Sequence, residues 1–225
     1  MPKILSPSFN RLSFGLVSAN TSTPVVFDAA TAFSAVSVTN TSFVHTPVGV
    51  PTCVVFSMGS FGVGDPSTLT YGGQNMTLVT GVATGVDNLS MAYLANPPSG
   101  PQTVFIDWGV STSGTAGGII SVTGSSLVTG IRASSRVSNT ANGTALSLTE
   151  TTSDPLDLIV MGWDQDTSGT FSLNDAVSTF RTNQTQGGIR FRMTTATGSS
   201  GSVAAALTST NSAVWGAIGV SIQHG

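Results

Sequence analysis

The feature that most constrains this chain is its near absence of the charged residues from which helices are built. Lys3 is the one lysine and Glu150 the one glutamate in 225 residues. Coiled coils and helical bundles use Ala, Glu, Lys and Leu in quantity, so these architectures are excluded. Charged residues make up 8% and hydrophobic residues 40% of the chain, whereas intrinsic disorder needs low hydrophobicity and high net charge. The chain is therefore expected to fold, and to do so with strands.

Short β-branched and aromatic segments follow one another after Pro24, separated by Gly, Pro, Asn and Ser. Residues 36–41 alternate apolar and polar side chains, as a half-buried strand does, and 52–58 is a nearly unbroken apolar run typical of a buried strand. In 102–108 the alternation places Val104, Ile106 and Trp108 on one face. Further strands are predicted at 89–93, 118–123, 130–137, 145–149, 156–163, 188–194, 202–207 and 213–222.

A β-hairpin is predicted over 68–78. Its arms are 68–71 and 74–78, and Gly72 and Gly73 supply the positive φ angles that a tight turn needs. Many short strands with close turn signals indicate a two-layer antiparallel β-sandwich over residues 25–225. Residues 1–24 are interpreted as an extended N-terminal arm, with four apolar anchors for docking: Ile4, Leu5, Phe9 and Phe14.

Composition also limits the partners and the compartment. Polar residues interrupt the first eleven positions, so no cleaved signal peptide is expected. Cys53 is the one cysteine, which excludes an internal disulfide, and we interpret it as a buried apolar residue. Seven cations and a net charge of −3 give no strong basic face for nucleic acid. No run of 18 apolar residues is present, so no membrane span is expected.

The scarcity of charge favours an assembled protein. Soluble sandwiches commonly guard their open strand edges with lysine, and this chain has none within residues 25–225. Neutral hydroxyl surfaces are also cheap to desolvate compared with charged ones. We therefore expect the protein to work in a homo-oligomer or a shell.

Motifs of catalysis are missing: the chain contains no G-x-S-x-G, H-E-x-x-H, P-loop or C-x-x-C sequence. We expect no enzymatic activity, although His45 or His224 could meet a nucleophile and an acid in space. A calcium loop is one interpretation of residues 164–175, with Asp164, Asp166, Ser168 and Asp175 as oxygen ligands. The alternative is a plain Asp/Gly turn between strands with no cofactor.

Two further groups of side chains could bind a partner. Strict alternation over 189–193 makes Arg190 and Arg192 project from the same side, where they could contact an acidic neighbour or simply be solvated. Aromatic residues within strands could form a carbohydrate-stacking platform, with core packing as the alternative. These residues are Tyr71, Tyr93, Trp108, Trp163 and Trp215.

Several segments in order resemble a group of jelly-roll-like β-sandwich proteins found in tailed-bacteriophage virions and in bacterial genomes. The carrying segments are His45-Thr46-Pro47-Val48-Gly49, residues 69–77 (LTYGGQNMT), residues 93–104 (YLANPPSGPQTV), residues 118–124 (GIISVTG) and residues 215–222 (WGAIGVSI). The resemblance covers most of residues 25–225 and carries no catalytic motif.

The resemblance implies a sandwich of jelly-roll type and a virion structural protein, most readily a decoration or cement protein on the capsid. Its partners would be the major capsid protein and further copies of itself, and it would assemble in the host cytoplasm. The alternative is a tail or surface adhesin module that binds host glycans.

Overall fold

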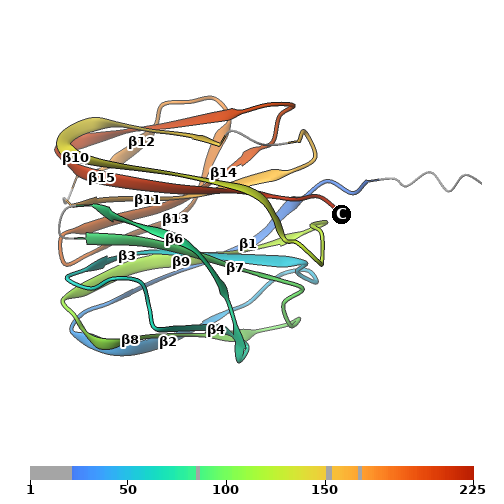
Figure 1. Cartoon of the computed structure of the whole chain (residues 1–225), viewed down its shortest axis with the longest axis horizontal. Coiled ribbons are helices and arrows are strands. Elements are labelled where there is room, and N and C mark those ends of the chain that lie inside the picture. The colour runs from blue at the N-terminus through green and yellow to red at the C-terminus, as the bar shows by residue number, and fades with distance from the viewer. Residues whose placement is uncertain (1–21, 85–86, 151–153, 167–168) are drawn as a thin grey trace, which may run out of the picture.

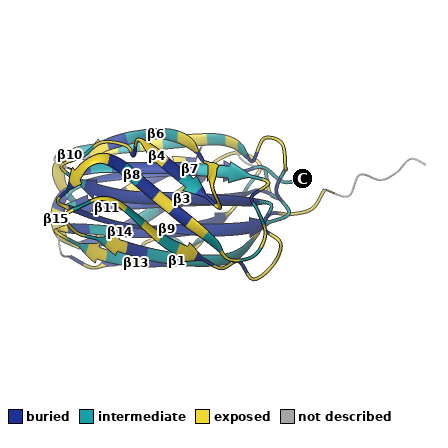
Figure 2. Cartoon of the chain, turned by 90° about the horizontal axis from the view of Figure 1, so that it is seen from below, coloured by how far each residue is buried: buried dark blue, intermediate teal, exposed yellow. Residues whose placement is uncertain are grey.

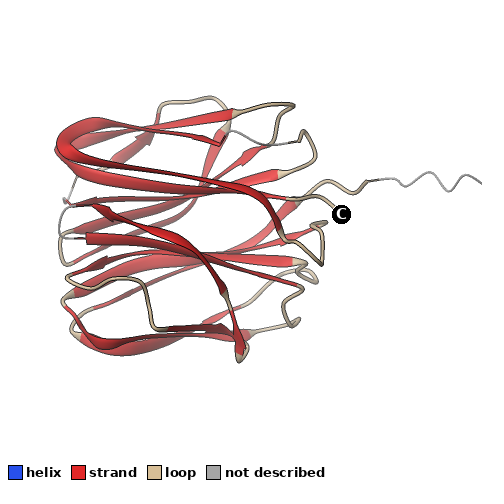
Figure 3. Cartoon of the chain, in the orientation of Figure 1, coloured by secondary structure: helices blue, strands red, loops and turns tan. Residues whose placement is uncertain are grey.

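The computed structural model describes residues 22–84, 87–150, 154–166 and 169–225, and these consist of strands and turns without a helix (Figure 3). The expected all-β antiparallel architecture is confirmed. The strands are β1 (Val26–Ala35), β2 (Val38–His45), β3 (Cys53–Phe61), β4 (Thr68–Tyr71), β5 (Gln74–Asn75), β6 (Thr77–Thr84), β7 (Asp87–Ala95), β8 (Gln102–Thr112), β9 (Gly114–Thr123), β10 (Ile131–Glu150), β11 (Leu158–Asp166), β12 (Phe171–Leu173), β13 (Ser178–Gln186), β14 (Ile189–Thr197) and β15 (Val203–Ile222).

Three sheets form the stack, one more than the two layers expected. The middle sheet has the order β1-β9-β3-β7-β6 and the small sheet the order β2-β8-β4-β5. The large sheet has the order β10-β15-β11-β14-β13, with β12 paired to β15. Figure 1 shows the middle sheet between the other two, so both of its faces are covered.

The central strands of the middle sheet explain why a third layer is present. In β3, Cys53 and Val55 pack toward the large sheet, while Val54 and Phe56 pack toward the small sheet. The neighbouring strand β9 is buried along nearly its whole length. A strand covered on both faces needs apolar residues at successive positions, which is the unbroken run in the sequence.

Two consecutive halves of the chain build the stack. The strands of the middle and small sheets, β1 to β9, end at Thr123, and the large sheet begins at Ile131. Each half has a core of its own, and a third apolar cluster joins the middle sheet to the large sheet. The fold is thus two β-rich halves joined across one interface.

Long strands that bend over the large sheet create its outer core. Strands β10 and β15 are 20 residues long each and pair on both sides of a bend, with register shifts between Asn139 and Ala145. Beyond the bend, Leu146, Leu148 and Leu207 fold back onto Trp163 and Trp215 of the same sheet. This arrangement buries the outer face of the large sheet within the domain.

The predicted hairpin is present, with a sheet switch at its end. Thr70 pairs with Asn75, and Gly72 and Gly73 have φ angles of 57° and 78°. After Met76 the chain leaves the small sheet, because β6 pairs with β7 in the middle sheet. The second arm is therefore split between two sheets.

Candidate interaction surface

The edges of the middle and large sheets cover each other. At one side Ser138 Oγ of β10 donates to the Ala83 carbonyl of β6 at 2.7 Å, and Arg136 Nη1 donates to the Gly81 carbonyl at 3.5 Å. At the other side the Arg181 guanidinium of β13 lies 3.8 Å from the centre of the Phe27 ring of β1. These contacts occupy edges that would otherwise offer unpaired backbone groups.

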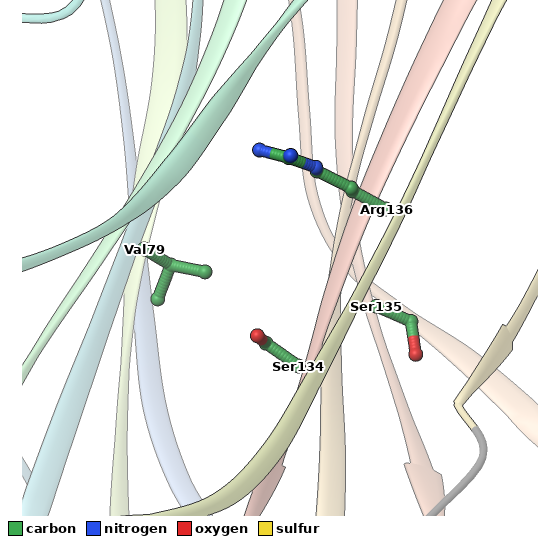
Figure 4. A pocket seen from close by; sticks show the side chains of 4 residues that line it. All are labelled: Val79, Ser134, Ser135 and Arg136. Carbon is green, nitrogen blue, oxygen red and sulfur yellow. The ribbon is translucent and has the colours of Figure 1, made fainter.

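Figure 4 shows the gap between β6 and β10, into which Val79, Ser134 and Arg136 point. The hollow there has a volume of about 100 Å³, which suits a few water molecules rather than a ligand. We interpret it as space left where the two edges meet.

In the described residues, the two edges of the small sheet, β5 and β2, are not covered by another sheet in the way that the edges of the larger sheets are. Strand β5 is two residues long, so it offers little backbone. Strand β2 is eight residues long and pairs with β8 on one side, and none of the described strands pairs with its other side. Its sequence carries no lysine, arginine, aspartate or glutamate. Strand β2 is therefore a long edge that lacks the usual protection by charged side chains.

Exposed apolar side chains concentrate along this sheet. In β8, alternate residues are buried and exposed (Figure 2), and Phe105 points outward with 36% exposure. Val44 of β2 is 57% exposed and Val48, just after β2, is 86% exposed. Exposed contiguous apolar surface commonly marks an interaction site. We name as the β2 surface the six exposed apolar residues on β2, β8 and the turns that flank β2: Val36, Val44, Val48, Val50, Phe105 and Val110.

Charge is distributed unequally over the three layers. All five described arginines belong to the large sheet: Arg132, Arg136, Arg181, Arg190 and Arg192. Asp107 is the one acidic residue on the described strands of the small sheet. Burial lowers the pKa of His45 in β2 to about 4, against the smaller effect of Asp28. The strands of the small sheet therefore carry one carboxylate and no arginine or lysine.

The two arginines predicted as a pair do lie together, but inside the large sheet. Both guanidinium carbons lie over the Phe171 ring, at 5.9 Å for Arg190 and 5.7 Å for Arg192. Arg192 is 4% exposed, and burial together with the charge of Arg190 lowers its pKa to about 10. Its Nη1 donates to the Phe191 carbonyl at 2.8 Å. Contact with a partner remains a prediction, with Arg190 the more accessible of the two.

The predicted calcium ligands are separated in the fold. Asp164 is buried between the middle and large sheets, where its carboxylate lies against Gly59. Asp175 instead closes a turn: it accepts the amides of Ser178 and Ala206 at 2.6 and 2.8 Å. Asp166 ends β11, and Ser168 lies outside the described residues. Within the described ranges, no group of three or more His, Cys, Asp or Glu side chains could hold a metal ion.

Core packing accounts for the aromatic residues considered as a carbohydrate platform. Tyr71, Trp108, Trp163 and Trp215 are all buried, and Tyr93 is half-buried. A stacking platform formed by these rings is therefore wrong, since a sugar needs an accessible ring face. The arm anchors Ile4, Leu5, Phe9 and Phe14 lie outside the described residues.

One buried carboxylate near the C-terminus, Asp157, is the centre of a hydrogen-bonded cluster that the sequence did not predict. Asp157 Oδ2 accepts Arg132 Nε at 2.6 Å and Ser221 Oγ at 3.0 Å, while Oδ1 lies 2.9 Å from His224 Nδ1 and accepts the His224 amide at 3.0 Å. Burial alone would raise the pKa of Asp157, but the hydrogen bonds from Arg132, His224 and Ser221 lower it to about 2.

This cluster anchors the C-terminus rather than forming a catalytic relay. In such a relay the serine hydroxyl bonds to the imidazole, whereas Ser221 donates to the carboxylate. No sequence motif could have revealed the cluster, because 25 residues separate Arg132 from Asp157 and 67 separate Asp157 from His224.

Comparisons of the chain with protein-family models, with curated proteins and with solved structures find no match. Among the described residues, no helix is long and apolar enough to span a bilayer. The geometry of the β2 surface and the composition of the sheets are therefore the features that bear on function.

Proposed function

We propose that this protein is a non-catalytic structural component of a bacteriophage virion, specifically a decoration or cement protein that bridges neighbouring subunits on the capsid. The observation that carries the proposal is the β2 surface, a set of exposed apolar side chains beside a strand edge without charged residues. Burial of apolar area contributes about 25 cal/mol per Å² before the costs of association, and a face with few charges loses little hydration on docking.

The resemblance to jelly-roll-like virion proteins supports the same proposal. A sandwich of jelly-roll type, with residues 1–24 as an arm that reaches the neighbouring subunit, would contact the capsid through the arm and through the small sheet. The major capsid protein would be the partner, and the protein would join the particle in the host cytoplasm.

The adhesin alternative has less support. Its aromatic platform was the feature that favoured glycan binding, and four of the five rings are buried. We therefore prefer a mechanical role for the protein.

Re-binding to particles tests the proposal. Virions from the source would be stripped of this protein and incubated with purified full-length chain, and bound protein would be measured by co-sedimentation. Replacing Phe105 by aspartate should weaken binding, because it exchanges an exposed apolar ring for a second carboxylate beside Asp107. The control is Val177→Asp, which charges an exposed apolar residue just before β13, on the large sheet (52% exposed against 36% for Phe105).

Two results would overturn the proposal. One is the absence of this chain from purified particles and of any binding to stripped ones. The other is equal loss of binding for the Phe105→Asp and Val177→Asp variants, which would assign no special role to the small sheet. Deleting residues 1–24 tests the arm separately: normal binding by the truncated protein would remove the arm from the docking mechanism.

A further inference from the structure

A hollow of about 480 Å³ opens on the large sheet, between the turn before β13 and the turn that joins β14 to β15. It is lined by residues 176–177, 197–199 and 202–204, whose side chains are small, apolar or hydroxylated, and Val177 is 52% exposed. A cavity of about 150 Å³ is enough to hold a benzene molecule. The hollow therefore has room for two large apolar side chains from a docked segment.

The N-terminal end of the described chain lies beside this hollow. The Val25 amide donates to the Leu156 carbonyl at 2.8 Å, and the adjoining Asp157 carbonyl accepts the Gly198 amide at 2.9 Å. Since Cα atoms across such pairs lie about 5 Å apart, roughly 15 Å separates Val25 from Gly198. Figure 1 shows the N-terminal segment entering the stack at the end where the C-terminus lies. The other two hollows, of about 100 and 270 Å³, lie between β6 and β10 and beside the hairpin over 68–78.

Charge favours the N-terminal segment as the occupant. Residues 1–21, which lie outside the described residues, contain Lys3 and Arg11 and no carboxylate, whereas the rest of the chain has five arginines and ten carboxylates. Asp154 packs against Gly198 at the rim of the hollow with its side chain 40% exposed, and Asp175 directly precedes the lining residues 176–177. A basic segment is attracted to a hollow with carboxylates at its rim.

We propose that residues 1–21 dock into this hollow of their own domain, with Phe14 and Leu16 as apolar anchors and Arg11 beside the acidic rim. The eleven residues from Phe14 to Val25 span up to about 36 Å when extended, more than twice the separation to be bridged. Because the segment is tethered, its effective concentration is in the millimolar range, which favours its own hollow over that of another copy. The inference goes beyond the proposed function: the free protein stores its arm on its own domain, and assembly would release the arm to the neighbouring subunit.

Disulfide cross-linking in the full-length protein tests the docking. Ser13→Cys is combined with Ala204→Cys in the hollow, or with Val128→Cys as the control. Val128 is 89% exposed, and its loop lies where the segment enters the fold, because a Cβ on Gly124 would meet the Pro24 carbonyl. A segment that does not dock reaches both sites equally. Docking should make the intramolecular disulfide with Ala204→Cys form at least about tenfold faster than with Val128→Cys.

Substitutions in the segment and at the rim test the anchors. Phe14→Ser should lower the cross-linking preference to less than about threefold, because the ring supplies much of the buried apolar area. Phe9→Ser, five residues farther from the fold, is the matched control and should keep the preference. Val177→Asp should also lower the preference, but it leaves the arm available to a particle, so it remains a control for the small sheet. Cys53 is buried, and burial raises the pKa of its thiol to about 12, so it does not interfere.

Three results would overturn the docking. The first is equal cross-linking rates at Ala204→Cys and Val128→Cys, and the second is a preference that Phe14→Ser leaves unchanged. The third is cross-linking mainly between copies at a rate that rises with protein concentration, which would place the segment on a neighbour. All three are measured on the isolated protein, so this failure is distinct from failure of the proposed function, which is measured by binding to particles.

Discussion

Replacing Asp157 by asparagine should destabilise the protein strongly. The substitution keeps the shape of the side chain but removes the charge that pairs with Arg132, and it turns one acceptor oxygen into a donor facing existing donors. Removing one partner of a buried ion pair costs about 3–5 kcal/mol. The Asp157 side chain is fully buried, but Arg132 is 28% exposed and stays partly hydrated, so we expect about 3 kcal/mol, the lower end.

Acid titration gives a second estimate of the same interaction. The pKa of Asp157 falls from 3.8 to about 2 on folding, which corresponds to roughly 2.5 kcal/mol. Since the folded pKa is the lower one, this stabilisation is present above about pH 4 and is lost as the pH falls through 2. The asparagine variant should lack that part of the acid dependence.

Thermal and urea unfolding at pH 7 and at pH 3 measure both effects. For a domain of this size, about 3 kcal/mol lowers the melting temperature by roughly 6–12 °C. Asp154→Asn is the control, because that side chain is 40% exposed and should contribute less than about 1 kcal/mol. An Asp157→Asn protein as stable as this control, with unchanged acid dependence, would refute the view that the cluster anchors the C-terminus.

Three other outcomes are expected. Burial, with the charge of Asp166, raises the pKa of Asp87 to about 7. Because the folded pKa is the higher one, the free energy of unfolding should decline between about pH 4 and 7. Asp87→Asn should abolish that decline, as urea midpoints measured across this range would record. Gly162→Ala should destabilise by about 1–3 kcal/mol, since its new Cβ would overlap Ser57 Oγ, and adding Ser57→Gly should restore part of the loss in melting experiments. Cys53 should resist alkylation in the native protein and react only under denaturing conditions, as mass spectrometry can record, and fast native labelling would contradict its burial.

Sequence patterns predicted the strands whose side chains alternate or form short apolar runs. They missed β1, which is rich in alanine, and β13, whose sequence STFRTNQTQ is mostly polar. They also divided β10 and β15 into two strands each, because the polar stretch at the bend resembles a loop. A period of two shows that a strand is buried, but it cannot show which sheet covers each face.

The candidate surface was predictable in kind but not in position. The lack of lysine indicated unguarded edges, yet only the fold reveals that Arg136, Ser138 and Arg181 help to cover four of them. The alternation at Arg190 and Arg192 correctly placed both on one side. It could not reveal that the bent strands enclose that side, because this depends on contacts between distant segments.

The division of the stack into consecutive halves suggests that the chain can be cut and rejoined. The connection between Thr123 and Ile131 contains Leu127 and Val128, which are 53% and 89% exposed, so a break between them disturbs little packing. Each fragment would retain an apolar cluster of its own. Each would also expose the apolar face that packs against the other fragment in the intact protein. Two separately produced fragments should therefore recognise each other and reconstitute the native molecule, so the protein is a natural starting point for a split reporter.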